Sequence, residues 1–70
     1  MTKEQEIEWL EEVIELCNDE PEKKVDDEHV TYIWEDLCQD DISSLLYVCE
    51  DTDNIWCQVV NFKFEVFYEK

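Results

Sequence analysis

The charge of this chain restricts its fold more than any other feature of the sequence. Of its 70 residues, 21 are Asp or Glu and only five are Lys, with no Arg, so the net charge is −16. Hydrophobic residues still make up 44% of the chain, and three Trp, three Tyr and three Phe are present. A disordered acidic tail would be poor in such residues. The sequence therefore predicts a folded core whose carboxylates face solvent.

The length and the cysteines limit the class of protein. Residues 1–70 suffice for one small domain, close to the lower limit for independent folding. The opening MTKEQEIEWL has acids where a secretory signal needs an apolar run, and no apolar stretch approaches the roughly 20 residues that span a bilayer. We expect a cytoplasmic protein without membrane contact.

The four cysteines of the chain are expected to be free thiols, with two disulfides as the alternative for a secreted chain. Their spacing also disfavours zinc.

The first quarter of the chain has the periodicity of an amphipathic helix. Thr2 and Gln5 form a potential capping box, and apolar residues from Ile7 to Cys17 occupy one half of the helical wheel. Acidic residues occupy the opposite side, with Glu6 as the exception. Pro21 and the polar run NDEPEKK predict the end of the helix and a linker.

The remaining sequence predicts strands. Residues 26–38 fit either a helix or a strand, and the β-branched and aromatic run HVTYIW favours the strand. The next segment, EDLCQDDI, is predicted to be a loop or a short helical turn. SSLLYVCE is predicted to be a strand and IWCQVV its hairpin partner. The turn between them is expected to have a residue in the left-handed conformation at Asp53 or Asn54. NFKFEVFYE alternates strictly and is expected to continue the preceding strand through a bulge at Asn61. The prediction is an α+β fold, in which the N-terminal amphipathic helix packs on a three-stranded antiparallel sheet in the order α-β-β-β.

Catalytic and metal sites find little support in the sequence. His29 is the only histidine, and no nucleophile adjoins it, so a structural role is expected. The chain has no glycine, which removes every Gly-rich phosphate loop. The stretch from Asp51 begins like a calcium-binding loop, but its sixth position is Trp56 rather than glycine. We expect no enzymatic activity, no bound metal and no cofactor.

Direct binding of nucleic acid is also disfavoured. Without Arg and with five scattered Lys, the chain offers no basic patch. Five aromatic residues are therefore expected in the core rather than stacked on bases, namely Trp9, Trp34, Trp56, Phe62 and Phe64. Phe67 or Tyr68 on an edge strand could instead mediate a homodimer, or could simply be partly buried.

Three acidic clusters remain as candidates for binding a partner. The first is a stripe along the N-terminal helix. The second and third are groups of acids close together in the sequence, and the acids around residue 51 are candidates to extend the third group. In order, the clusters are Glu4, Glu8, Glu11 and Glu15; Asp26, Asp27 and Glu28; and Glu35, Asp36, Asp40 and Asp41, joined by Glu50, Asp51 and Asp53.

The charge density resembles that of duplex DNA. Sixteen charges correspond to roughly 27 Å of duplex, and a compact domain of this length has a diameter of roughly 28 Å. The leading hypothesis is therefore a DNA-mimicking inhibitor that occupies the DNA-binding surface of a basic host protein. One alternative is an acidic inhibitor of another nucleic-acid machine, such as a CRISPR effector, a restriction enzyme, a uracil-DNA glycosylase or RNA polymerase. Another is an interaction adaptor that uses an exposed aromatic sheet.

A family resemblance points in the same direction. In stretches such as EQEIEWLEEVIEL and DDEHVTYIWEDLCQDD, the chain resembles the small acidic host-takeover proteins of bacteriophages. Among these it is most similar to the Bacillus phage inhibitors of the nucleoid protein HU. The resemblance implies a DNA mimic in the bacterial host cytoplasm and a basic partner, the HU dimer. It covers the profile of the whole chain, so no functional residue is carried over from the family.

Overall fold

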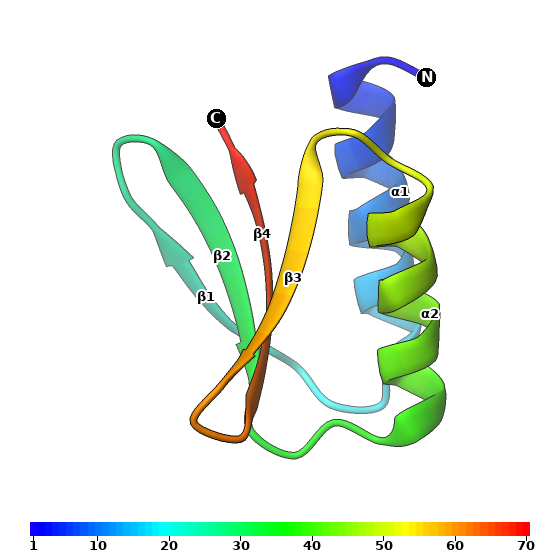
Figure 1. Ribbon diagram of the computed structural model, residues 1–70, viewed down its shortest axis with the longest axis vertical. Helices are drawn as coiled ribbons and strands as arrows, with labels where there is room; N and C mark the ends of the chain where they lie inside the picture. The colour runs from blue at the N-terminus through cyan, green and yellow to red at the C-terminus, as the bar shows by residue number, and fades with distance from the viewer.

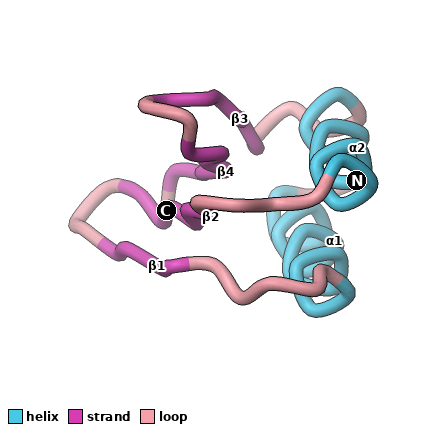
Figure 2. The backbone as a smooth tube through the Cα atoms, turned by 90° about the horizontal axis from the view of Figure 1, so that it is seen from below, coloured by secondary structure: helices cyan, strands magenta, loops and turns pink.

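Two helices lie side by side on one face of a four-stranded antiparallel sheet in the computed structural model, which describes residues 1–70 (Figure 1). The elements are α1 (Lys3–Leu16), β1 (Glu22–Val25), β2 (His29–Trp34), α2 (Gln39–Glu50), β3 (Ile55–Val60) and β4 (Lys63–Glu69). Seen from below, the helices form one layer and the sheet the other (Figure 2). The predicted α+β class is confirmed. The three strands in α-β-β-β order are wrong in detail, because β1 is an additional strand, α2 replaces the second predicted strand, and β3 and β4 replace the third.

Helix α1 forms where the sequence predicts it. The Thr2 hydroxyl accepts a hydrogen bond from the Gln5 N–H at 3.2 Å, and the Gln5 side chain accepts one from the Thr2 N–H at 2.8 Å. This capping box satisfies two N–H groups that the first turn leaves without helical partners. Leu10 is fully buried, and the helix ends at Leu16.

Of the helix and the strand that the sequence allowed for residues 26–38, the structure has the strand, β2. β2 buries Val30, Tyr32 and Trp34 while the intervening side chains stay partly exposed, which is the period-two pattern of a half-buried strand. β1 pairs with it in the segment for which a linker was expected. All four β1 residues are exposed, so backbone pairing rather than an apolar pattern defines this strand.

Residues 39–50 form helix α2, so the strand expected for SSLLYVCE is wrong. Leu45 and Val48 are buried, whereas Leu46 and Tyr47 are exposed. Burial at a spacing of three residues marks one face of a helix. Asp40 in the first turn favours the helix dipole.

β3 and β4 form a hairpin rather than one strand with a bulge. Val60 pairs with Lys63, and the two residues between them, Asn61 and Phe62, have φ angles of 51° and 65°. Positive φ at both central positions fits the right-handed twist of a two-residue hairpin turn. The left-handed residues therefore lie here and not at Asp53 or Asn54.

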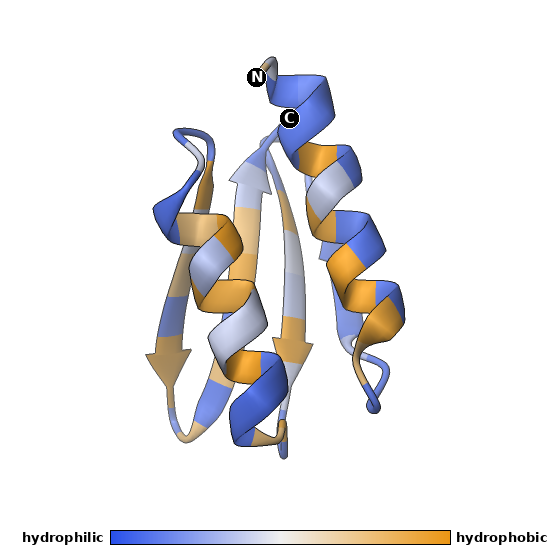
Figure 3. Cartoon of the chain, turned by 90° about the vertical axis from the view of Figure 1, so that its right-hand side faces the viewer, coloured by the Kyte–Doolittle hydropathy of each residue, from blue (hydrophilic) through white to orange (hydrophobic).

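The core lies between the helices and the inner face of the sheet. Apolar and polar residues alternate along both helices, which lie in front of the sheet in Figure 3. Ten buried hydrophobic side chains form one cluster: Leu10, Val30, Tyr32, Trp34, Leu45, Val48, Ile55, Phe64, Val66 and Tyr68. No helix covers the outer face of the sheet (Figure 1).

The strand order β1-β2-β4-β3 makes β4 a central strand. The expected place of Phe67 or Tyr68 on an edge strand is therefore wrong. Tyr68 is buried on the inner face, and Phe67 lies on the outer face. β1 and β3 are the two edges of the sheet.

Candidate functional site

The acidic stripe of α1 is exposed along the whole helix. Glu4, Glu8, Glu11 and Glu15 are all solvent-exposed. At 1.5 Å per residue, the stripe extends over about 16 Å. The structure therefore presents the first predicted cluster as one continuous row.

The second cluster occupies the turn between β1 and β2, where Asp26 also has a structural role. Its Oδ1 accepts hydrogen bonds from the backbone N–H of His29 at 2.6 Å and of Glu28 at 2.8 Å. These bonds stabilise the carboxylate and hold the pKa of Asp26 below its usual value. The neighbouring Asp27 and Glu28 are exposed. Asp26 thus closes the turn that displays the other two acids.

The third cluster divides into two groups. Asp40 and Asp41 lie in the first turn of α2, whereas Glu50 ends that helix, followed by Asp51 and Asp53. Twelve helical residues separate the two ends by about 18 Å. The extension from residues 50–53 is therefore not continuous with the rest of the cluster.

Two acids of the third cluster have partners within the fold. Asp41 is half-buried and its Oδ2 accepts a hydrogen bond from the Asn18 N–H at 3.1 Å, which joins the end of α1 to the start of α2. Glu35 lies 3.3 Å from the Lys63 ammonium, the one lysine–carboxylate ion pair of the chain. Asp36 and Asp40 are exposed. Fewer carboxylates of this cluster are therefore available to contact a partner than the sequence suggests.

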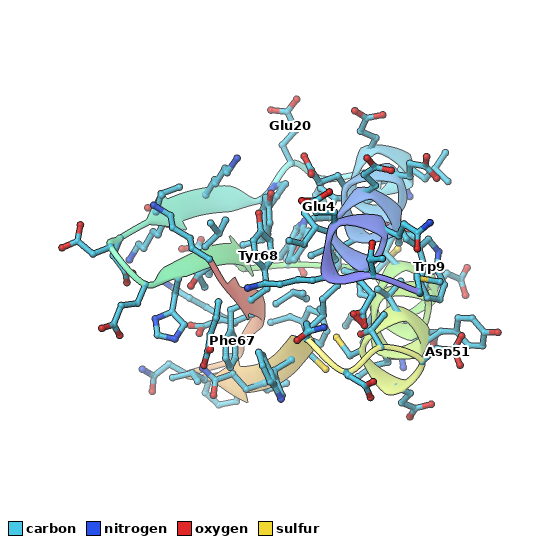
Figure 4. All side chains as sticks on the ribbon, turned by 90° about the horizontal axis from the view of Figure 1, so that it is seen from above. Glu4, Trp9, Glu20, Asp51, Phe67 and Tyr68 are labelled. Atoms are coloured by element: carbon cyan, nitrogen blue, oxygen red, sulfur yellow. The ribbon has the colours of Figure 1, made fainter.

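The second and third clusters lie at the two ends of the molecule, and the row along α1 runs between these ends (Figure 1). The start of α1, the β1–β2 turn and the α2–β3 turn lie at one end, and the end of α1 and the start of α2 lie at the other (Figure 1). Viewed along the long axis, Glu20 and Asp51 point outward at separate parts of the outline (Figure 4). The negative charge therefore surrounds the helical layer and both ends.

Glu6 is an important residue that the functional prediction left out. Its side chain is only 3% exposed. It accepts hydrogen bonds from the Asp53 N–H at 2.8 Å and the Asn54 side-chain amide at 2.9 Å. These bonds, the one from Asn54 foremost, lower the pKa of Glu6. Its place on the apolar side of the helical wheel was the signal for this buried role.

The four cysteines are free, and the surroundings of Cys17 and Cys49 suppress thiolate formation at these two residues. Burial, followed by contact with Cys57, raises the pKa of Cys49 to about 12. Burial, followed by the charge of Asp41, raises the pKa of Cys17 to about 11. No group of three or more His, Cys, Asp or Glu residues is arranged to hold a metal ion.

The outer face of the sheet carries an aromatic group. Phe67 stacks on Trp56 with ring centroids 5.9 Å apart, and His29 meets it edge-on at 6.4 Å. Trp56 is 42% exposed and Phe62 is 96% exposed, so neither is the core residue that the sequence predicted. His29 Nδ1 lies 3.8 Å from Asp26 Oδ1.

Comparisons with protein-family models, curated proteins and solved structures found no match. Neither helix is long and apolar enough to cross a membrane.

Proposed function

We propose that this protein is a DNA-mimicking inhibitor that occupies the DNA-binding surface of a basic host protein, with the HU dimer as the best candidate. The observation that supports this proposal is that the net charge of the protein, divided by its length, matches that of duplex DNA. The longest dimension of the molecule is 29 Å, over which duplex DNA carries about 17 phosphate charges. The net charge of the chain is −16.

The arrangement of the charge supports the same function. Nearly all of the acids are exposed, and one lysine–carboxylate pair is the only lysine contact that offsets them. A basic groove that normally binds phosphates would be attracted by such a surface and would be blocked by the body of the domain. The mechanism is steric and electrostatic and needs no cofactor. If the chain is encoded by a phage, it acts in the cytoplasm of the bacterial host.

The acidic row of α1 is the part best suited to replace a phosphate strand. Glu4, Glu8, Glu11 and Glu15 are spaced by three to four residues, or about 5–6 Å, a separation on the scale of successive phosphates along a DNA strand. Asp27, Glu28 and Asp51 extend the negative surface at one end. We expect these residues to dominate the contact, and Asp26 and Asp41 to act mainly through the fold.

A second candidate function rests on the outer face of the sheet. The exposed Trp56, stacked on the partly buried Phe67, suits an interaction adaptor whose acids serve solubility. The two functions differ in salt dependence, because apolar contacts weaken little with salt while phosphate-like contacts weaken steeply.

Competition with DNA is the decisive test. Purified HU would be bound to a fluorescent DNA duplex, and the protein would be added at about 50 and 200 mM salt while anisotropy is measured. A mimic should release the duplex, and its affinity for HU should fall severalfold or more at the higher salt. A stable ternary complex with DNA still bound would refute the proposal for HU. The same assay with other DNA-binding proteins would identify a different target.

A further inference from the structure

The β3 edge of the sheet lacks the features that usually prevent strand pairing. Its sequence, IWCQVV, contains no charged residue and no proline. The other edge strand, β1, has only four residues and includes Lys23 and Lys24. Short length and lysines both discourage pairing at a sheet edge. Because β3 pairs only with β4, alternate β3 residues direct their N–H and C=O groups to the open side.

An apolar groove adjoins the last residues of this edge. A cavity of about 300 Å³ opens between α2 and the β3–β4 hairpin. Its lining includes Leu37, Ile42, Leu46, Val59 and Phe62. Val59 is 70% exposed. A side chain from a strand added to β3 would therefore find an apolar surface beside it.

Phe62 marks the end of this groove and is unusual in two respects. It is 96% exposed, and its φ of 65° is a conformation that favours glycine or asparagine. An aromatic residue in such a position contributes little packing and strains the turn. A strained and exposed residue of this kind is a feature that points to function.

Charge identifies the kind of partner. Acidic residues flank the edge at both ends, with Asp51 and Asp53 just before β3 and Asp36 beside the groove, where Glu35 already pairs with Lys63. A second copy would bring the same carboxylates together, with a net charge of −16 on each chain. An extended segment with apolar residues in its centre and lysine or arginine at its ends would meet opposite charges instead.

We infer that the β3 edge and its groove bind an extended, basic-ended segment of a protein partner as a fifth strand of the sheet. Main-chain hydrogen bonds would supply the pairing, and the groove with Phe62 would select apolar side chains. This contact goes beyond DNA mimicry, because it requires neither the α1 row nor a partner that binds DNA. The two proposals can therefore fail separately.

The test is a titration followed by the amide NMR signals of the intact protein. The probe is a peptide of about seven residues, matched to β3, with alternating valine and threonine and a lysine at each end. Its control has glutamate at both ends. We expect the lysine peptide to shift the amides of Ile55, Cys57 and Val59 and the groove residues, and the glutamate peptide to leave them unchanged.

Two variants make the test specific. Phe62→Gly should weaken binding of the lysine peptide by about tenfold, as for loss of an aromatic anchor, although the turn itself becomes less strained. Val59→Lys should also weaken it, while Val59→Thr keeps a β-branched residue and serves as the control. Unmoved β3 amides, equal binding of the glutamate peptide, or shifts confined to α1 would overturn the inference. Self-association through β3 without peptide would assign the edge to a second copy and likewise overturn it.

Discussion

The carboxylate of Glu6 in α1 accepts a 2.9 Å hydrogen bond from the side-chain amide of Asn54, which lies 48 residues later in the chain. A second bond, from the Asp53 N–H at 2.8 Å, engages the other carboxylate oxygen. Together they attach the first turns of α1 to the α2–β3 turn. One acid of this highly acidic chain is thus used to hold the fold together.

Replacing Glu6 should therefore destabilise the protein, unlike replacing its exposed neighbours. We expect Glu6→Ala to lower the melting temperature clearly, because the Asp53 N–H and the Asn54 amide lose a charged acceptor. Glu8→Ala is the matched control, since Glu8 is exposed on the same helix. The Glu8→Ala substitution should leave the melting temperature unchanged, or raise it by reducing the repulsion between carboxylates. Thermal denaturation followed by circular dichroism measures both, and equal effects would contradict the role of Glu6.

The contribution of Glu6 should also depend on pH. Its pKa is lowered in the folded state, so its stabilising effect is present above the unfolded glutamate pKa of about 4.3 and is lost as pH falls through the lower folded value. The difference in stability between the parent and Glu6→Gln should accordingly shrink below about pH 4. Denaturant unfolding from neutral to acidic pH would measure it. A difference that stays constant would show that ionisation of Glu6 is not involved.

The sequence predicts elements best where side-chain burial follows a simple period. α1, β2 and β4 each have one apolar face. α1 and β2 were predicted as such, and β4 was predicted to be extended, although as a continuation of β3 rather than its hairpin partner. β1 could not be predicted because its residues, Glu22–Val25, are all exposed. It forms by backbone pairing with β2, to which its side chains contribute no apolar pattern.

Helix α2 shows a different limit. Ile42, Leu45 and Val48 have helical spacing, but the run SSLLYVC also has the length and apolar content of a buried strand, and periodicity alone does not separate the two. The exposed acids of the candidate site were predictable from composition. The roles of Asp26 and Asp41 depend on contacts with His29 and Asn18, which only the folded chain brings together.

The different burial of Leu45 and Leu46 in α2 makes a prediction of its own. Leu45→Ala should destabilise the protein by about 2–5 kcal/mol, because it leaves a cavity in the core. Leu46→Ala is the matched control, and the 37% exposure of Leu46 should make its cost well under half as large. Chemical denaturation would compare the two. Comparable losses would indicate that the two leucines do not differ in burial.

The strained turn between β3 and β4 should be improved by glycine. Phe62→Gly creates an Asn-Gly turn, the preferred sequence for two positive φ angles. Removal of the side-chain clash should stabilise the protein by about 1 kcal/mol, or raise its melting temperature by about 4–8 °C. Phe62→Ala is the control, because alanine removes the ring and keeps the strain. If both variants behave alike, the backbone of this turn is not strained.

The cysteines should differ in reactivity toward a thiol-specific reagent. Only the thiolate reacts readily, and burial raises the pKa of Cys49 to about 12. Cys38 is exposed and should be modified first near pH 8, with Cys17 and Cys49 modified far more slowly. Mass spectrometry of timed samples would give the order. Rapid modification of Cys49 in the folded protein would contradict its buried environment.

The last prediction distinguishes a specific acidic surface from net charge alone. Replacing Glu8, Glu11 and Glu15 by Gln removes three charges from the α1 row and preserves helix propensity. Replacing Glu20, Glu22 and Glu69 by Gln removes the same charge elsewhere. If α1 replaces a phosphate strand, the first variant should bind the partner more weakly, mainly through slower association. The second should stay close to the parent. Kinetic binding measurements at low and high salt would separate them, with the folded state checked by circular dichroism. Equal losses in both variants would show that total charge matters and that the α1 row has no special place in the contact.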